Sequence, residues 1–350
     1  MTTLQALLGI EHPLIQAPLA GVQDHGLAAA VSNAGALGSL PCAMLAAPAL
    51  QSELEKLQAA TDRPYNVNFF AHTNPVPDPS REAAWRQALA PYYAQFDIDP
   101  ASIGAGPGRQ PFSAESAELL ARFKPKVVSF HFGLPAPEAM QRIRDWGGRI
   151  IASATTVAEA RWLAERSVDA VIAQGVEAGG HRGIFLSDDL TTQVGLFSLL
   201  PQIVQAVSVP VIAAGGIADA NGVAAAMALG AAGVQVGTAY MLCPEATTSA
   251  VHRAALKSEG AVHTALTNLF TGRPARGIVN RVIRELGPIS AAAPAFPLAT
   301  AAIAPLRAKA EAQGSGEFTS LWAGQNVSGC REIAAAELTA TLLEGLYRHR

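Results

Sequence analysis

The sequence is poor in charge. Only 15% of its 350 residues are Asp, Glu, Lys or Arg, and the formal net charge is −3. Half of the residues are hydrophobic, which excludes intrinsic disorder and long charged tails. There is no basic surplus to attract nucleic acid, although a local cluster of donors can still hold one phosphate. The sequence therefore predicts a globular protein that acts on a small molecule.

Cysteine is also scarce. Cys42, Cys243 and Cys330 lie far apart, and none has a cysteine or histidine nearby at metal-ligand spacing. We therefore expect neither a disulfide framework nor a metal site. The N-terminal residues lack the basic segment of a secretory signal and reach Glu11 and His12 after a short apolar run. These features predict a cytoplasmic protein.

Two long stretches without Asp, Glu, Lys or Arg, residues 220–244 and 286–306, do not predict membrane spans. The first divides into an alanine-rich helix pattern, a glycine turn and a short strand pattern. The second is interrupted by four prolines: Pro288, Pro294, Pro297 and Pro305. We expect no membrane or nucleic-acid partner, and a monomer or homodimer.

Short apolar, β-rich segments alternate with helix-length amphipathic segments along the chain. Eight strands are predicted at residues 12–20, 37–41, 65–70, 126–132, 149–154, 169–174, 210–214 and 233–239. Helices are predicted at 26–33, 48–60, 114–123, 137–146, 157–166, 192–207 and 221–229. The nearly continuous apolar strands are typical of a parallel sheet covered on both faces. This order and size favour an α/β fold of the TIM (β/α)8 barrel type, with an open Rossmann-like sheet as the alternative.

Two regions exceed a minimal barrel. Residues 71–112 are rich in proline and aromatic residues and predict a long loop insertion over the catalytic face. The tail after residue 245 predicts helical pieces at 248–257, 301–313 and 330–347. We therefore expect a barrel over residues 1–245 and a mainly helical cap subdomain over 246–350 that supplies the last helix of the barrel.

Glycines follow the seventh and eighth predicted strands, where TIM barrels commonly bind phosphate. Gly215 and Gly216 precede Asp219, a candidate helix N-cap. The eighth strand ends in Gln235, Val236, Gly237 and Thr238. Glycine lets backbone N–H groups approach an anion closely, and a helix N-terminus adds its positive dipole. Each motif alone fits an ordinary tight turn equally well, but their joint occurrence predicts a phosphate site.

The segment after the sixth strand has the most distinctive composition. Gln174 places an amide at the barrel mouth, where it can bond the edge of a heterocycle. Gly179 and Gly180 would bring the backbone against a cofactor and leave His181 projecting into the site. Histidine titrates near neutral pH, so it can act as a base, an acid or a cationic donor. A packed loop histidine is the structural alternative.

Other strand ends supply further candidates. His131 ends the fourth strand, where a hydrogen-bonded barrel histidine is nearly as good an interpretation as a substrate contact. Asn68 in the third strand is the better cofactor contact, whereas Asn66 can simply satisfy barrel backbone. The first strand ends in small residues that can lie flat against a ring: Pro18, Leu19 and Ala20. Three arginines could meet an acidic substrate or be solvated or paired with glutamates: Arg182, Arg273 and Arg276.

Together these segments resemble the class I branch of the nitronate monooxygenase family, formerly called 2-nitropropane dioxygenases. The resemblance spans the chain through the segments QAPLAG, NVNFFAH, SFHFG, QGVEAGGHRG, AAGGI, QVGTAY, FTGRPARG and LWAGQ. The one visible departure is Leu19, where the family often has Met after Pro. By the resemblance, the residue at this position would contact the bound cofactor without supplying a functional group.

The resemblance implies a TIM barrel with a helical domain, non-covalent FMN, and oxidation of alkyl nitronates such as propionate 3-nitronate. With O₂ as co-substrate, the products would be a carbonyl compound and nitrite, a route of nitroalkane detoxification. The family pattern puts His181 in the catalytic role and places eight residues around FMN: Asn68, Gln174, Gly179, Gly216, Gln235, Val236, Gly237 and Thr238. The same QG-x-EAGGH core also occurs in FMN-dependent reductases. Reduction of a quinone or an enoyl thioester by NAD(P)H is therefore the alternative function.

Overall fold

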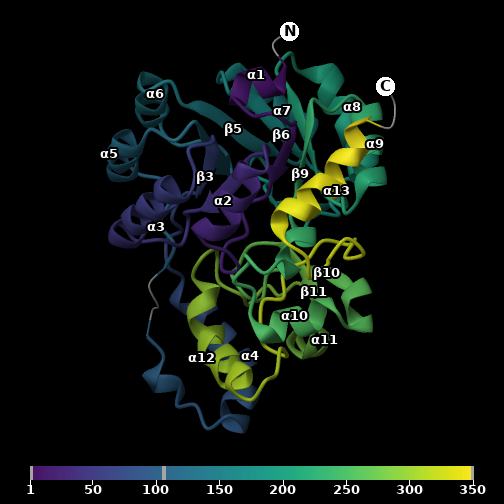
Figure 1. Ribbon diagram of the computed structural model, residues 1–350. Coiled ribbons are helices and arrows are strands. Elements are labelled where there is room, and N and C mark those ends of the chain that lie inside the picture. The colour runs from purple at the N-terminus through teal and green to yellow at the C-terminus, as the bar shows by residue number, and fades with distance from the viewer. Residues whose placement is uncertain (1–2, 105–107, 348–350) are drawn as a thin grey trace.

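The computed structural model describes residues 3–104 and 108–347, and its larger part is a parallel β-barrel (Figure 1). The strands run in the order β1-β9-β8-β6-β5-β4-β3-β2, and the outer two meet through a parallel bridge between Ile15 and Leu37. The backbone N–H of Gln16 donates to the Leu37 carbonyl at 2.9 Å at the same seam. The eight strands are β1 Leu14–Gln16, β2 Gly38–Pro41, β3 Tyr65–Phe70, β4 Val127–His131, β5 Arg149–Ala154, β6 Ala170–Gln174, β8 Val211–Ala214 and β9 Gly233–Val236. The predicted TIM barrel is thus confirmed.

Helices surround the barrel because alternate side chains of each strand point outward into one continuous core. This core includes Val67 and Phe69 of β3 and Val128 and Phe130 of β4. The outer helices are α2 His25–Asn33, α3 Ala47–Ala60, α5 Ala114–Phe123, α6 Pro137–Asp145, α7 Val157–Glu165, α8 Leu196–Ala206, α9 Ala220–Ala228 and α13 Ala335–Tyr347. Helix α13 packs against α9 and α2, so the C-terminal segment completes the ring.

The two ends of the barrel interior differ in polarity. At the amino ends of the strands, α1 Leu4–Leu8 inserts Leu4 and Leu8 into a cluster with Ile15 and Ile151. Figure 1 shows α1 at this end and a second lobe at the opposite end, over the carboxyl ends of the strands. The open end available to a ligand is therefore the one that the lobe covers.

The lobe combines the insertion after β3 with most of the C-terminal tail. It contains α4 Pro79–Gln95, α10 Ala250–Leu256, α11 Arg281–Leu286 and α12 Ala299–Ala312. Its small antiparallel sheet has the order β10-β11-β7, from β10 Thr264–Thr267, β11 Ala275–Ile278 and β7 Gly180–His181. The lobe also includes short 3₁₀ turns, η1 Pro100–Ser102 and η4 Glu259–Val262. Two more, η2 Leu190–Thr192 and η3 Thr238–Leu242, lie at the barrel mouth.

The insertion at 71–112 is not the plain loop that the sequence predicted, because it contains the long helix α4. The Asp78 carboxylate caps this helix by accepting from the backbone N–H groups of Ser80 and Arg81. Trp85 and Tyr93 are buried against α12, where they donate to the carbonyls of Ala299 and Ala302. The end of the insertion returns to the barrel, where the Phe112 N–H donates to the Phe70 carbonyl at the end of β3. The domain limits at 245 and 246 stay a prediction.

Within the described residues, no helix combines the length and apolar character that crossing a bilayer requires. Residues 220–244 form α9 and β9 as the pattern indicated, but the strand ends at Val236, three residues earlier than predicted, and the 3₁₀ turn η3 follows. Residues 286–306 form the crossing before α12 and its first half. The described part of the chain also holds no group of three or more His, Cys, Asp or Glu side chains placed to bind a metal ion.

Candidate active site

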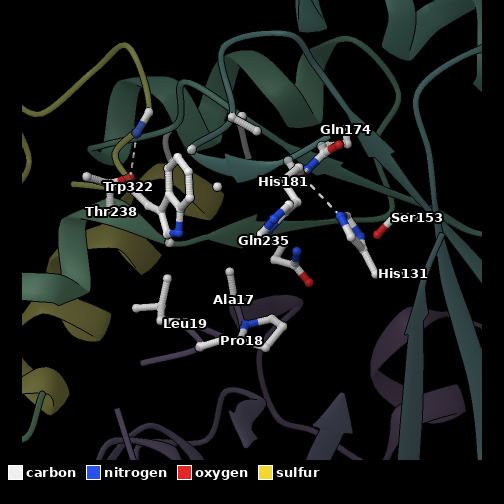
Figure 2. Close-up of a pocket in the computed structure, with 18 of the residues that line it drawn as sticks. Ala17, Pro18, Leu19, His131, Ser153, Gln174, His181, Gln235, Thr238 and Trp322 are labelled. Carbon is white, nitrogen blue, oxygen red and sulfur yellow. Dashed lines mark hydrogen bonds between the residues drawn. The ribbon is translucent and has the colours of Figure 1, made fainter. Parts of the chain in front are cut away.

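A pocket lies at the carboxyl ends of the barrel strands, beneath the lobe (Figure 2). Its walls bring together most of the predicted site residues: Pro18, Leu19, Ala20, Asn68, His131, Gln174, Gly179, Gly180, His181, Gly215, Gly216, Gln235, Gly237 and Thr238. Val236 does not line the pocket. Its side chain is 1% exposed and packs in the core outside the barrel, while its carbonyl accepts from the Ala17 N–H. The Val236 side chain thus packs away from the pocket, and only its backbone carbonyl contributes to the loop after β1.

The floor of the pocket is a buried polar network inside the barrel. Asn68 donates from Nδ2 to Ser129 Oγ at 2.9 Å, and Asn66 donates from Nδ2 to the same oxygen and to Ser39 Oγ. Asn66 therefore bonds side chains and not the barrel backbone that the sequence suggested. Gln23 accepts from the Leu19 N–H at 2.7 Å and donates to the Ser39 carbonyl. This network fixes both Asn68 and the loop after β1.

Two glutamine amides face the pocket in different hydrogen-bonding states. The Gln174 amide is largely committed to its own loop, because Nε2 donates to the His181 carbonyl and Oε1 accepts from the Gly183 N–H at 2.7 Å. This arrangement leaves less of Gln174 for a heterocycle than predicted. Gln235 Oε1, in contrast, is buried without a partner among the described residues. A buried acceptor without a partner is costly, so Gln235 is the amide that calls for a ligand donor.

The glycine turns form the other end of the pocket. Gly215 and Gly216 have φ angles of 117° and 71°, a region that favours glycine, and they directly precede α9. Asp219 caps α9 as predicted, accepting from the Gly222 N–H at 2.8 Å. Thr238 Oγ1 accepts from the Gly324 N–H at 3.0 Å, which joins this end to the C-terminal segment.

His131 is held in its neutral form. Its Nε2 donates to the His181 carbonyl at 3.0 Å, because a carbonyl can only accept. Burial lowers the pKa of His131 to about 4, and the charges of Arg273 and Arg182 oppose protonation further. The hydrogen-bonded barrel histidine that the sequence left open is thus realised, and the bond ties β4 to the segment that carries His181.

His181 lies in β7, at the junction of barrel and lobe. Thr271 Oγ1 donates its hydrogen to the Arg273 carbonyl at 3.3 Å, so it accepts from His181 Nε2 at 2.9 Å. The Nδ1 atom of His181 therefore carries a lone pair. Burial lowers the pKa of His181 well below its usual value, and the charge of Arg109 lowers it further. The imidazole is a neutral acceptor here, not the cationic donor that the sequence also allowed.

The three arginines are neither solvated nor paired with glutamates. Arg182 is fully buried and donates to the carbonyls of Gln174 and Gly175. Arg276 is 6% exposed and donates to the Val176 carbonyl and to Thr264 Oγ1. Arg273 donates to a backbone carbonyl of the segment after β7 and lies with its guanidinium carbon 4.1 Å from the centroid of the Phe132 ring. All three hold backbone segments together around the pocket.

Aromatic side chains cover the His181 side of the pocket. The rings of Phe70, Phe132 and Phe296 lie within 6.0 Å of the His181 ring, centroid to centroid. Trp322 approaches the same ring at 5.6 Å. Figure 2 shows Trp322 entering the pocket beside His181. A substrate at His181 would therefore be shielded from water.

The sequence profile of the nitronate monooxygenase family matches residues 1–345. The chain belongs to this family. Two curated nitronate monooxygenases, from Pseudomonas aeruginosa and Paraburkholderia phytofirmans, are each 41% identical to it. The alignments cover 97% of this chain in both cases, and 97% and 93% of the respective relatives. The resemblance inferred from the motifs is thereby confirmed.

Solved structures agree with the membership in the nitronate monooxygenase family. A nitroalkane oxidase from Streptomyces ansochromogenes superposes with a TM-score of 0.89 at 38% identity, covering 99% of this chain and 98% of that one. FabK from Thermotoga maritima superposes with a TM-score of 0.70 at 25% identity, covering 99% of this chain and 96% of that one. Both likenesses include the lobe as well as the barrel.

This member of the nitronate monooxygenase family has pocket residues that the sequence reasoning missed. They include Arg109, His252, Trp322, Gly324 and Asn326. Trp322 and Gly324 belong to the LWAGQ segment, which served only as a mark of resemblance. Arg109 follows the glycine-rich stretch GAGPG in the sequence of the insertion and carried no recognisable signal. A residue that lines a pocket from a loop belongs to no periodic sequence pattern, so its position cannot be predicted from periodicity.

Proposed function

We propose that this chain is an FMN-dependent enzyme that oxidises alkyl nitronates, such as propionate 3-nitronate, with O₂ to a carbonyl compound and nitrite. The family membership supports the reaction class. The observation that carries the proposal is a single pocket with glycine turns at one end and the neutral His181, under aromatic rings, at the other.

The residues of the pocket fit FMN. Gln235 Oε1 is a buried acceptor without a described partner, and it suits an N–H group of the flavin ring. The backbone of Gly215, Gly216 and Gly237 with Thr238 would hold the phosphate at the start of α9. Asn68 and the loop after β1 would position the ring. Bound FMN would supply the transfer of electrons between nitronate and O₂.

The two ring nitrogens of His181 differ in their hydrogen bonding. Its Nε2–H is held by Thr271, so Nδ1 is the atom that can accept a proton from a neutral nitroalkane. Because burial depresses the pKa of His181, it is a weak base. A nitronate has already lost its carbon-bound proton. The anion therefore needs no base and is the better substrate.

The decisive experiment is anaerobic stopped-flow reduction of the FMN-loaded protein by a nitronate, NADH or NADPH in turn. We expect fast reduction by the nitronate, and oxygen consumption with nitrite release in air. Fast reduction by a pyridine nucleotide with transfer to a quinone or an enoyl thioester, and no reaction with nitronates, would establish the reductase alternative. Purified protein that is colourless and does not take up FMN would refute the cofactor assignment.

Replacement of His181 by Asn tests its role. If His181 is the base, the variant should lose about 10²- to 10⁴-fold of its activity on neutral nitroalkanes and retain weaker activity on nitronates. Flavin content is measured alongside both activities. A variant with full FMN and an undiminished rate on the neutral nitroalkane rules out the base role and makes His131 the next candidate. Equal loss of both activities together with FMN indicates a structural role.

A cytoplasmic location and a monomeric or homodimeric state stay predictions from the sequence.

A further inference from the structure

Arg109 enters the pocket from the insertion after β3, and the barrel holds its position. Its carbonyl accepts from His72 Nε2 at 3.1 Å. Three residues later, the Phe112 N–H donates to the Phe70 carbonyl at 2.8 Å, which anchors the returning chain to the end of β3. The backbone is thus held at the Arg109 carbonyl and again at Phe112, and the Arg109 side chain lines the pocket.

Within the described residues, the Arg109 guanidinium has no counter-ion. Its side chain makes no hydrogen bond or ion pair with any residue in the ranges 3–104 and 108–347, and Nη1 is buried without a partner. The guanidinium carbon lies 5.5 Å from the centroid of the Phe296 ring. Burial lowers the pKa of Arg109, and the charge of Arg307 lowers it further. An arginine nevertheless remains charged at neutral pH.

Arg109 is the arginine at the site whose side chain makes no hydrogen bond to a described residue, although Arg273 Nε is likewise buried without a partner among them. The guanidinium groups of Arg182, Arg273 and Arg276 each donate to backbone carbonyls. A buried cation without compensating bonds is expensive. Arg109 therefore has free donors in a place where an anion would satisfy them.

Arg109 and His181 flank one ring. The Phe296 centroid is 5.4 Å from the His181 ring, and the charge of Arg109 has a stronger effect on His181 than any other charge. A small substrate can therefore reach both groups. With its nitronate at His181, a chain of two or three carbons would place a second functional group near the guanidinium.

Building on the proposed function, we propose that Arg109 is a specificity-determining residue that binds a carboxylate at the far end of the nitronate substrate. The planar guanidinium fork matches a carboxylate in a bidentate arrangement. The enzyme thereby selects nitronates that carry a carboxylate over nitronates with uncharged chains.

The test compares two substrates of the same chain length, propionate 3-nitronate and propyl 1-nitronate, in which a methyl group replaces the carboxylate. In Arg109→Gln we expect kcat/KM for propionate 3-nitronate to fall about 10- to 100-fold, mainly through KM. For propyl 1-nitronate it should change less than about threefold. Arg109→Lys should recover part of the loss. Arg122→Gln, an exposed site on α5, controls for the change in net charge.

Two results would overturn the proposal. Equal losses on both substrates would mean that Arg109 provides no carboxylate selectivity, and a loss of FMN content with activity would mean that it holds the cofactor or the fold. Titration of propionate by calorimetry adds a readout without turnover, in which the wild type should bind and Arg109→Gln should not. If neither nitronate is oxidised but this difference persists, the proposed reaction fails while the carboxylate site stands.

Discussion

Arg182 offers the sharpest test of how the active-site loop is held. Its guanidinium makes three hydrogen bonds: Nη1 to the Gly175 carbonyl at 2.7 Å, Nη2 to the Gln174 carbonyl at 2.8 Å, and Nε to Gln193 Oε1 at 3.0 Å. The first two bonds join the end of β6 to the residue after His181, and the third adds Gln193. Burial lowers the pKa of Arg182 to about 10, so it remains charged at neutral pH.

The cost of removing Arg182 follows from these contacts. A hydrogen bond to a charged group contributes about 1.5–3 kcal/mol, and the desolvation of the guanidinium offsets part of the total for three. We therefore expect Arg182→Ala to lower the free energy of unfolding by about 3–5 kcal/mol. For 350 residues the unfolding entropy is about 0.7 kcal/mol/K, which converts this loss into a fall in Tm of about 4–7 °C.

Thermal unfolding followed by circular dichroism, with FMN content measured on the same samples, provides the assay. Arg182→Lys keeps the charge but lacks the planar fork, so it should recover less than half of the lost Tm. Arg161→Ala, at an exposed position on α7, is the control and should change Tm by less than about 1 °C. A Tm for Arg182→Ala within about 1 °C of the wild type would refute the reasoning.

Three further predictions concern other parts of the molecule. A Cβ at Gly179 would lie 2.5 Å from the backbone N of Gly324, so Gly179→Ala should destabilise the protein by about 1–3 kcal/mol and weaken FMN binding in a fluorescence titration. Gly180→Ala is the comparison: its φ is 70° and no atom lies within 4 Å of the added Cβ, so it should lower the free energy of unfolding by about 1 kcal/mol. Burial lowers the pKa of His252 to about 4, so below about pH 6.5 the unfolded chain takes up a proton that the folded chain does not. Between pH 7.5 and 5.0 this group alone should remove about 2 kcal/mol of stability, a slope that urea titrations of His252→Gln should lack. Trp85→Ala should lower stability by about 3–5 kcal/mol in the same titrations, because Trp85 fills the buried face of α4; a loss below about 1 kcal/mol would contradict this packing.

Much of the barrel could be predicted from the sequence because its signals are local. Strands β3 and β5 are short, β-rich segments that follow proline or glycine, and their predicted bounds equal the observed ones. Strand β1 is shorter than predicted, because only residues 14–16 pair with neighbours while the small residues after it turn into the pocket wall.

The lobe was harder to predict because its contacts are distant in sequence. Trp85, Leu89, Tyr92 and Tyr93 have helical spacing, but prolines before and within α4 disguised it, and their partners lie about 200 residues away. The strand β7 consists of two residues and is defined only by its pairing with β11. No local pattern can reveal such a strand.

The candidate site shows the same division. Glycine turns and strand-end polar residues could be assigned to one pocket because the fold brings all strand ends together. The hydrogen-bonding states of these residues could not be predicted, because they depend on partners far along the chain. The Gln174 amide is largely committed to His181 and Gly183, whereas the Arg109 guanidinium meets no partner among the described residues.

The pairing of β7 with β11 connects His181 to both the barrel and the lobe. The residue is connected through the chain to the barrel strand β6, yet its backbone is hydrogen-bonded into the sheet of the lobe. A chimaera that exchanges the lobe between relatives must therefore include residues 180 and 181. Otherwise His181 would pair with a β11 strand from a different protein. Exchange of the lobe alone would therefore also change the sheet that positions His181.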